Sequence, residues 1–173
     1  GIDILIANSG AAFQGSMLNV KKDILEKSLE VNFYSHHNIV QKIANIMVSQ
    51  GFGGSISLNL SKQSINPGKD FGPYGIAKAS SLFSMKQYAL EFGKYNIRVN
   101  GINADRIKSG LLTDQFIKER AKARNMSSTE YLKNNLLQKQ VTAEDVAEAF
   151  FAQLSFEKTT GNIITVDGGN IEA

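Results

Sequence analysis

Residues 3–8 read "DILIAN", a short run of isoleucine and leucine that is followed by the turn formers Ser9 and Gly10. A brief apolar run closed by turn residues is typical of a strand buried on both faces of a parallel sheet. We therefore predict a strand and then a turn. Because ligands of open α/β sheets bind beyond the carboxyl ends of the strands, we expect functional residues in this turn and in its counterparts.

Three more apolar stretches alternate with helical patterns along the chain. We predict strands in "SISLNLS" (55–61), "IRVNGINA" (97–104) and "GNIITVDGG" (161–169). Apolar residues at three- and four-residue steps predict one long helix or two consecutive helices over 20–50, a helix over 74–95, two short polar helices between 111 and 140, and a helix in "TAEDVAEAFFAQL" (142–154), where Thr142 and Asp145 resemble a capping box. This alternation indicates an α/β fold, a three-layer Rossmann-like parallel sheet with helices on both faces.

The composition indicates one globular domain. The chain has 173 residues, of which 42% are hydrophobic and 20% are charged, too few charges for a disordered chain. No apolar run approaches the roughly 18 residues of a membrane helix, and the first residues lack a secretory signal. The absence of cysteine leaves neither a disulfide framework nor a thiolate metal site. We expect a soluble, cytoplasmic protein without a membrane partner.

Two features that suggest other partners have simpler explanations. The net charge is +3, but the basic residues are scattered through helical patterns, which indicates solvated helix faces rather than a nucleic-acid partner. His36 and His37 are adjacent, and neighbouring side chains on a helix point about 100° apart. No acidic or histidine cluster joins them, so we assign no metal site.

The stretch "FGPYGIAKASS" (71–81) places Tyr74 and Lys78 one helical turn apart on the same face. A free tyrosine has a pKa near 10, and a fixed positive charge beside it favours the ionised form. The pair is thus a candidate general acid/base whose pKa we expect to be lowered. An ordinary helix start with a surface lysine would show the same spacing, so the pair alone does not decide between the two.

Two other polar residues strengthen the first alternative. Ser61 ends the second predicted strand, where its hydroxyl would hold a substrate oxygen beside the phenol of Tyr74. Asn32 lies in the middle of a predicted helix, an awkward place for a side chain that competes for backbone hydrogen bonds unless it has a task.

Five motifs, in this order and spacing, resemble the short-chain dehydrogenase/reductase family over almost the whole chain: "LEVNFYS", "GSISLNLS", "YGIAK", "IRVNGIN" and "TGNIITVDGG". The resemblance implies NAD or NADP as cofactor and a small alcohol or carbonyl compound as substrate. It implies that Tyr74 is the catalytic acid/base, that Ser61 orients the substrate, that Lys78 contacts the nicotinamide ribose, and that Asn32 holds the water of a proton relay. It also implies a homo-oligomer built on the helices that contain Asn32 and Tyr74.

The same resemblance extends to the turns after the strands. "ANSG" (7–10) is similar to the family's Asn-Asn-Ala-Gly turn, which implies that Asn8 and Gly10 lie close to the cofactor. Ile107 and Ser109 match the positions that hold the nicotinamide. Ala104 and Asp105 replace the family's usual Pro-Gly, and Asp105 is either a substrate contact or a turn former. Gly168 and Gly169 match a structural turn near a subunit interface.

The family's glycine-rich phosphate loop has no counterpart before "DILIAN". We therefore expect residues 1–173 to form one partial domain that lacks the amino-terminal strands of the full fold, with "DILIAN" as an open sheet edge. We also expect this chain by itself neither to bind a dinucleotide tightly nor to catalyse hydride transfer. A catalytically silent module of a longer protein is the alternative to an oxidoreductase. The retained Asn, Ser, Tyr and Lys argue against it without excluding it.

The segment 105–150 and the last residues look like the dehydrogenase portion of bifunctional aldolase/short-chain dehydrogenase proteins, which implies a small hydroxyaldehyde or a sugar as substrate. Within it, 109–140 occupies the family's substrate-loop region as a helical insert. Its basic residues Lys118, Arg120, Lys122 and Arg124 serve either a phosphorylated sugar or merely a solubilising helix face, of which we favour the second.

Overall fold

The computed structural model describes residues 1–170 and contains one parallel sheet. Its strands are β1 (Ile4–Ala7), β2 (Gly54–Asn59), β3 (Ile97–Ala104) and β4 (Ile163–Val166). They lie in the order β1-β2-β3-β4, and every neighbouring pair is parallel. β1, β3 and β4 fall within the predicted stretches, and β2 begins one residue before its stretch, at Gly54, because short apolar runs bounded by turn residues indicate strands.

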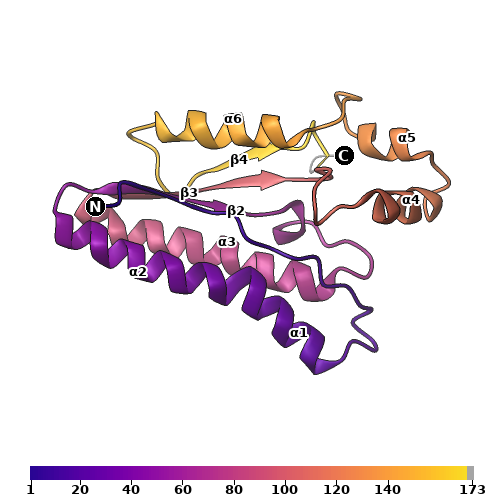
Figure 1. Cartoon of the computed structure of the whole chain (residues 1–173), viewed down its shortest axis with the longest axis horizontal. Helices are drawn as coiled ribbons and strands as arrows, with labels where there is room; N and C mark the ends of the chain where they lie inside the picture. Colours follow the sequence, from indigo (N-terminus) through magenta and orange to yellow (C-terminus); the bar gives the residue numbers. More distant parts are fainter. Residues whose placement is uncertain (171–173) are drawn as a thin grey trace.

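Helices cover both faces of the sheet, which confirms the predicted three-layer architecture (Figure 1). One face carries a continuous helix made of α1 (Lys22–Leu29), the π-helical η1 (Glu30–Tyr34) and α2 (Ser35–Gln50), together with α3 (Gly72–Phe92). The other face carries α6 (Ala143–Leu154). Beyond the carboxyl ends of the strands lie the short α4 (Asp114–Lys122) and α5 (Ser128–Lys133) (Figure 1). Two 3-10 turns, η2 (Lys62–Ser64) and η3 (Gly93–Tyr95), complete the order.

None of the helices within residues 1–170 is both long and apolar enough to cross a membrane.

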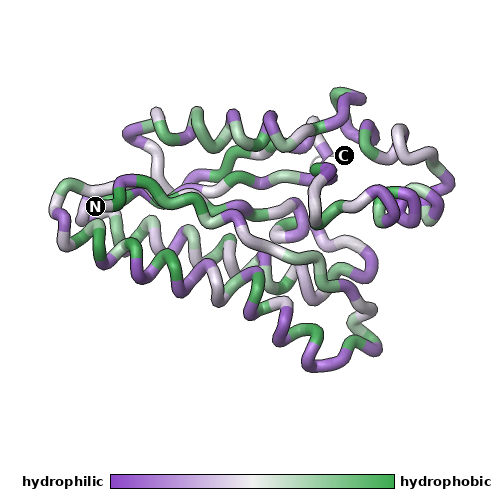
Figure 2. Tube along the Cα trace, viewed as in Figure 1, coloured by the Kyte–Doolittle hydropathy of each residue, from purple (hydrophilic) through white to green (hydrophobic). Residues whose placement is uncertain are grey.

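The main core lies between the sheet and the face covered by α2 and α3. Its fully buried side chains include Val40, Met47, Ile56, Met85 and Val99. Figure 2 shows the same distribution, with hydrophobic strands in the middle and long hydrophilic stretches on α4. Each such side chain stabilises the fold by about 1.5–3 kcal/mol through its removal from water. A smaller core beneath α6 contains Ile102, Val146 and Phe150.

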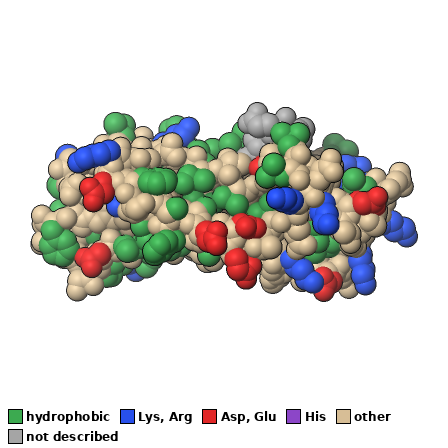
Figure 3. Space-filling model, turned by 90° about the horizontal axis from the view of Figure 1, so that it is seen from above, with side chains coloured by type: hydrophobic (Ala, Val, Ile, Leu, Met, Phe, Trp, Pro, Cys, Tyr) green, Lys and Arg blue, Asp and Glu red, His purple; other side chains and the backbone are tan. Residues whose placement is uncertain are grey.

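Strand β1 is not buried on both faces, so that expectation is wrong. Ala7 is buried, whereas Ile4 and Ile6 are 50% and 43% exposed. The reason lies in the position of the strand: β1 pairs only with β2 among the described residues, and α6 packs on β3 and β4. Figure 3 looks onto this side and shows apolar side chains on the surface. Within residues 1–170, β1 is therefore a sheet edge with one uncovered apolar face.

The predicted cap of α6 is present. The Thr142 hydroxyl accepts a hydrogen bond from the Asp145 amide, and the Asp145 carboxylate accepts one from the Thr142 amide at 2.8 Å. Aspartate thus replaces the more usual glutamate at the third helical position.

Candidate active site

Tyr74 lies in the first turn of α3, which begins with Gly72 and Pro73 after the loop. The start is favourable because proline at the first helical positions needs no amide partner. Tyr74 is only 8% exposed, and its phenol is hydrogen-bonded to Ser61, which follows β2. The structure therefore brings the predicted Ser61 and Tyr74 together.

Lys78 lies one turn later and is also buried, at 3% exposure. Its ammonium nitrogen is 5.7 Å from the centre of the Tyr74 ring and donates a hydrogen bond to the Asn59 carbonyl at 2.8 Å. Burial lowers the pKa of Lys78 to about 8, because a charged ammonium loses its hydration there. This side chain is not the surface lysine of an ordinary helix.

The pKa of Tyr74 moves against our prediction. Burial raises it above its usual value of 10, the hydrogen bond with Ser61 lowers it, and the charge of Asp105 raises it further. Loss of water around the phenol outweighs the hydrogen bond with Ser61, and Lys78, whose ammonium donates to the Asn59 carbonyl, does not offset it. Tyr74 is consequently a protonated phenol at neutral pH, the form that donates a proton.

Asn32 lies in η1, and π-helical turns are rare and frequently found at functional sites. Its carboxamide donates to the Ala11 carbonyl at 2.9 Å and accepts from the Ala11 amide at 3.0 Å. Its backbone carbonyl accepts a hydrogen bond from Ser81 at 2.8 Å. The task of the side chain in this structure is to fix the loop after β1; the water-holding role remains a prediction.

Gly10 lies in the loop after β1, next to the buried Lys78. A Cβ atom on Gly10 would lie 3.1 Å from Asn32 Oδ1 and 3.7 Å from Lys78 Nζ. Asn8 Oδ1 accepts a hydrogen bond from the side-chain nitrogen Nδ2 of Asn59 at 2.6 Å, which ties the residue after β1 to the end of β2. The loop is thus held close to Lys78 from two sides.

Two hollows meet at Tyr74. The first, which we call the β1-side cavity, lies between the ends of β1 to β3 and α6. It is lined by all six residues predicted to bind the cofactor: Asn8, Gly10, Tyr74, Lys78, Ile107 and Ser109. The six residues that the motifs assign to the cofactor thus lie around one cavity, and their roles in binding it remain predictions.

The second hollow, which we call the α4-side pocket, opens toward α4 and α5. It is lined by Ser61, Tyr74, Phe71, Asp105, Arg120 and Tyr131, among others. Since Tyr74 lines both hollows, its phenol lies at their boundary. A molecule in either hollow would approach the same hydroxyl.

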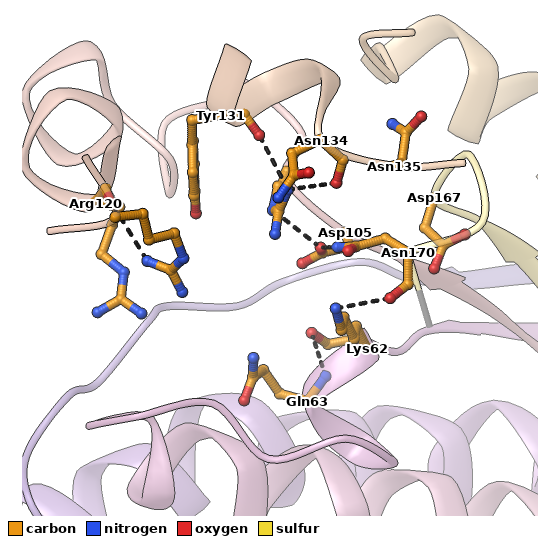
Figure 4. A network of polar contacts seen from close by, with 12 residues as sticks. Lys62, Gln63, Asp105, Arg120, Tyr131, Asn134, Asn135, Asp167 and Asn170 are labelled. Carbon is orange, nitrogen blue, oxygen red and sulfur yellow. Dashed lines mark hydrogen bonds and ion pairs between the residues drawn. The ribbon is translucent and has the colours of Figure 1, made fainter. Parts of the chain in front are cut away.

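Asp105 belongs to a polar network at the wall of this pocket (Figure 4). Its carboxylate accepts a hydrogen bond from Asn170 and lies 3.5 Å from the Arg106 guanidinium. Lys62 donates to the Asn170 carbonyl at 2.9 Å. Burial raises the pKa of Asp105, and Arg106 and Lys62 lower it. Asp105 is more than a turn former, because it holds the pocket wall; whether it contacts substrate remains a prediction.

Sequence reasoning missed several residues of this pocket. Lys62 and Gln63 follow Ser61 directly, so their position next to a predicted site residue was a usable signal. Phe71 and Tyr131 also line the pocket. Tyr131 carries no such signal, because only the folding of α5 over the strand ends brings it there.

The histidines and the last glycines lie outside the two hollows. His36 Nε2 is 2.8 Å from the Ser9 carbonyl, and burial with the nearby charge of Lys78 lowers the pKa of His36 to about 4. His37 is hydrogen-bonded to the Tyr88 hydroxyl at 2.6 Å. Residues 1–170 contain no group of three side chains able to hold a metal ion. Gly168 and Gly169 have φ angles of 67° and 89° and form a turn, as expected.

Comparison with known proteins decides the family. The family model described as "Enoyl-(Acyl carrier protein) reductase" matches residues 1–170. The chain belongs to the short-chain dehydrogenase/reductase family. It is 32% identical, over 98% of its length, to the "Uncharacterized oxidoreductase YuxG" of Bacillus subtilis, of which it covers 26%. It is 29% identical, over 97% of its length, to an L-rhamnose 1-dehydrogenase (NAD(P)(+)) of Sphingomonas, of which it covers 65%.

A solved short-chain dehydrogenase structure shows the same fold. Gluconate 5-dehydrogenase from Burkholderia cenocepacia, in complex with NADP and tartrate, superposes with a TM-score of 0.85 at 20% identity. The match covers 100% of this chain and 66% of that one. The chain thus spans about a quarter to two thirds of the length of these relatives.

Proposed function

We propose that this chain carries the catalytic groups of an NAD(P)-dependent oxidoreductase that interconverts an alcohol and a carbonyl compound. The observation that carries the proposal is the position of Tyr74, a buried proton donor bonded to Ser61 at the boundary of two hollows. In this proposal the β1-side cavity receives the nicotinamide and the α4-side pocket receives the substrate, with residues 109–140 as the substrate loop.

The residues of the β1-side cavity fit a nicotinamide nucleoside. Glycine at position 10 leaves room beside Lys78 that a Cβ would fill. Asn59, which lines the cavity, has a buried side-chain oxygen without a hydrogen-bond partner among the described residues, and the ammonium of Lys78 supplies a donor. When bound, the nicotinamide supplies the hydride for reduction of a carbonyl carbon.

The protein's own groups manage the proton. Ser61 donates a hydrogen bond to the carbonyl oxygen, and the Tyr74 phenol transfers its proton to that oxygen as the carbon is reduced. The phenolate left on Tyr74 is stabilised by Lys78, which is mostly charged below its pKa of about 8. In the oxidation direction the same phenolate takes the proton back. Asn32 acts by fixing the loop beside Lys78 and, in the proposal, by holding a water of the relay that passes a proton to Lys78 as the lysine returns one to the Tyr74 phenolate.

Replacement of the phenol tests this function. In the full-length polypeptide, Tyr74→Phe should lower kcat by about 10²–10⁴-fold, because a positioned acid contributes that much. Cofactor affinity and melting temperature should stay close to wild type. Tyr95→Phe, which removes a hydroxyl from a half-exposed tyrosine after α3, is the matched control. Near-normal turnover in Tyr74→Phe, measured with NADH and NADPH, would remove Tyr74 from this role and with it the proposal.

Finer assignments extend the proposal. The name of the L-rhamnose 1-dehydrogenase supports a small hydroxyaldehyde or a sugar as substrate. A longer, bifunctional polypeptide is proposed from the resemblance of residues 105–150 alone, and mass spectrometry of the native protein would test it. Apolar side chains exposed on α2 and α3 support a homo-oligomer.

A further inference from the structure

We propose that the substrate carries an oxyanion group, a phosphate or a carboxylate, and that Arg120 and Arg124 bind this group at the far end of the α4-side pocket. The inference rests on the proposed function, whose substrate it narrows. It reverses the preference for a solubilising face that the sequence alone suggested.

The structure separates the four basic residues of this segment into two pairs. Arg120 and Arg124 follow Phe116 at four-residue steps, and all three line the α4-side pocket. Lys118 and Lys122 are exposed, and neither lines the pocket. Lys118 and Lys122 thus form a solvated basic face, as expected. Arg120 on α4 and Arg124, which is exposed in the turn after α4, line the pocket together with Ser61 and Tyr74.

The two arginines keep hydrogen-bond donors available, with one donor of Arg124 (Nη1) used for the Arg120 carbonyl at 3.3 Å. Among residues 1–170 neither forms an ion pair with a carboxylate. The Arg120 guanidinium stacks on the Phe71 ring at 5.0 Å, and Arg124 lies 5.5 Å from the Tyr131 ring. Such stacking uses the face of the guanidinium and leaves its N–H edge for planar recognition of an oxyanion. Arg120 Nε is moreover buried without a hydrogen-bond partner in this part of the chain.

Arg106 lines the same pocket and has a structural role, because its guanidinium donors are used by partners within the protein. It pairs with Asp105 and donates to the carbonyl oxygens of Tyr131 and Asn134 at 3.0 and 2.7 Å. Its donors are used to hold α5 against the end of β3. Arg120 has no such set of partners, so a structural role explains the first arginine but not the second.

The charge balance of the pocket points the same way. Four cations line it, Lys62, Arg106, Arg120 and Arg124, against the single carboxylate of Asp105. That carboxylate is already engaged by Arg106 and Asn170. Figure 4 shows Arg120 and Tyr131 across the open space from Lys62 and Gln63. An anion entering this space would meet positive charge from both sides.

Aromatic contacts connect the proposed acid to Arg120. The Phe71 ring centre is 6.2 Å from that of Tyr74 and 5.0 Å from the Arg120 guanidinium carbon, so Phe71 contacts both the acid and the arginine. Phe116 packs edge-on against Phe71 at 6.1 Å and holds it there. Tyr74, Phe71 and Arg120 line the same pocket, so one small substrate can contact both the proposed acid and the arginine.

Matched substrates test the inference in the full-length polypeptide. With NADH or NADPH, kcat/KM is measured for glyceraldehyde 3-phosphate against glyceraldehyde, and for succinate semialdehyde against butanal. The anionic member of at least one pair should be preferred, and the pair that shows the preference tells phosphate from carboxylate. Arg120→Gln and Arg124→Gln should each lower the ratio of anionic to neutral kcat/KM about tenfold to a hundredfold, the range for a lost charge-assisted hydrogen bond.

Controls separate this inference from folding and from the function itself. Lys118→Gln and Lys122→Gln remove the same charge from the exposed face and should leave the ratio unchanged. Arg120→Lys should keep part of the preference, and melting temperatures report on folding. Calorimetric binding of the same compounds to the Tyr74→Phe protein gives a readout that needs no turnover. Equal binding and equal kcat/KM within both pairs, or a ratio unaffected by Arg120→Gln, would overturn the inference even if Tyr74 proves essential.

Discussion

Tyr74 and Lys78 lie in the same buried environment, and burial moves their pKa values in opposite directions, that of the phenol upward and that of the ammonium downward. Both shifts have one physical cause, since each charged form loses hydration. The spacing in the sequence predicted the contact between the two residues correctly. It could not predict the protonation state, because desolvation depends on what α3, β2 and the loop after β1 place around the phenol.

The pH dependence of stability should reveal the buried lysine. The pKa of Lys78 is about 8 in the folded chain and near 10.5 when unfolded, so between these values the unfolded chain binds more protons. The free energy of unfolding should therefore rise with pH over this interval, by on the order of 3 kcal/mol, and show the full penalty below pH 8. Urea titrations at pH 7.5 to 10 measure it. Lys78→Met should lack this rise, and parallel curves for the two proteins would contradict the assignment.

At the scale of elements, periodicity located the four strands and the α-helices of residues 1–170, but neither the π-helical η1 nor the 3-10 turn η2. A wide turn changes the path of the helix without changing which residues are apolar, so "LEVNFYS" carries no signal for it beyond the misplaced Asn32. The split of Arg120 and Arg124 from Lys118 and Lys122 was hidden for a similar reason. Charge alone does not tell which face of α4 meets the pocket; the four-residue step from Phe116 would have done so.

Two glycines offer a matched test of how tightly the loop after β1 is held. Gly10→Ala would place its Cβ 3.1 Å from Asn32 Oδ1, whose carboxamide is fixed by Ala11. It should destabilise the fold by about 1–3 kcal/mol and weaken cofactor binding. Gly93→Ala has no atom within 4 Å of its Cβ and a helical φ of −55°, so it should stabilise by about 0.4–1 kcal/mol. Thermal unfolding measures both stabilities. A Gly10→Ala protein as stable as wild type would show that the loop after β1 moves to make room for the Cβ without loss of stability.

At the scale of the whole molecule, the sequence predicted the layers and an open sheet edge at β1, but not that one face of this strand is uncovered. A run such as "DILIAN" is as apolar as a central strand, and only the sheet order shows that Ile4 and Ile6 have no helix over them. The gathering of Asn8, Gly10, Tyr74, Lys78, Ile107 and Ser109 around one cavity was predictable. Parallel strands bring their carboxyl ends to one edge, so motifs at strand ends meet there.

The surface of α3 leads to the last prediction, which concerns assembly. Ile76, Phe83 and Leu90 recur at seven-residue steps on this helix and are 41%, 71% and 77% exposed. Seven residues are close to two helical turns, so the three side chains form one apolar stripe, a feature that marks interaction surfaces. We expect the full-length polypeptide to form oligomers through it.

Light scattering should give more than one chain per particle, and Phe83→Lys with Leu90→Lys should reduce the particle to one chain. Phe52→Lys, at a 63% exposed apolar residue in the turn after α2, should leave the mass unchanged. A wild-type monomer at micromolar concentration, or an oligomer that survives both α3 substitutions, would place the interface elsewhere or nowhere.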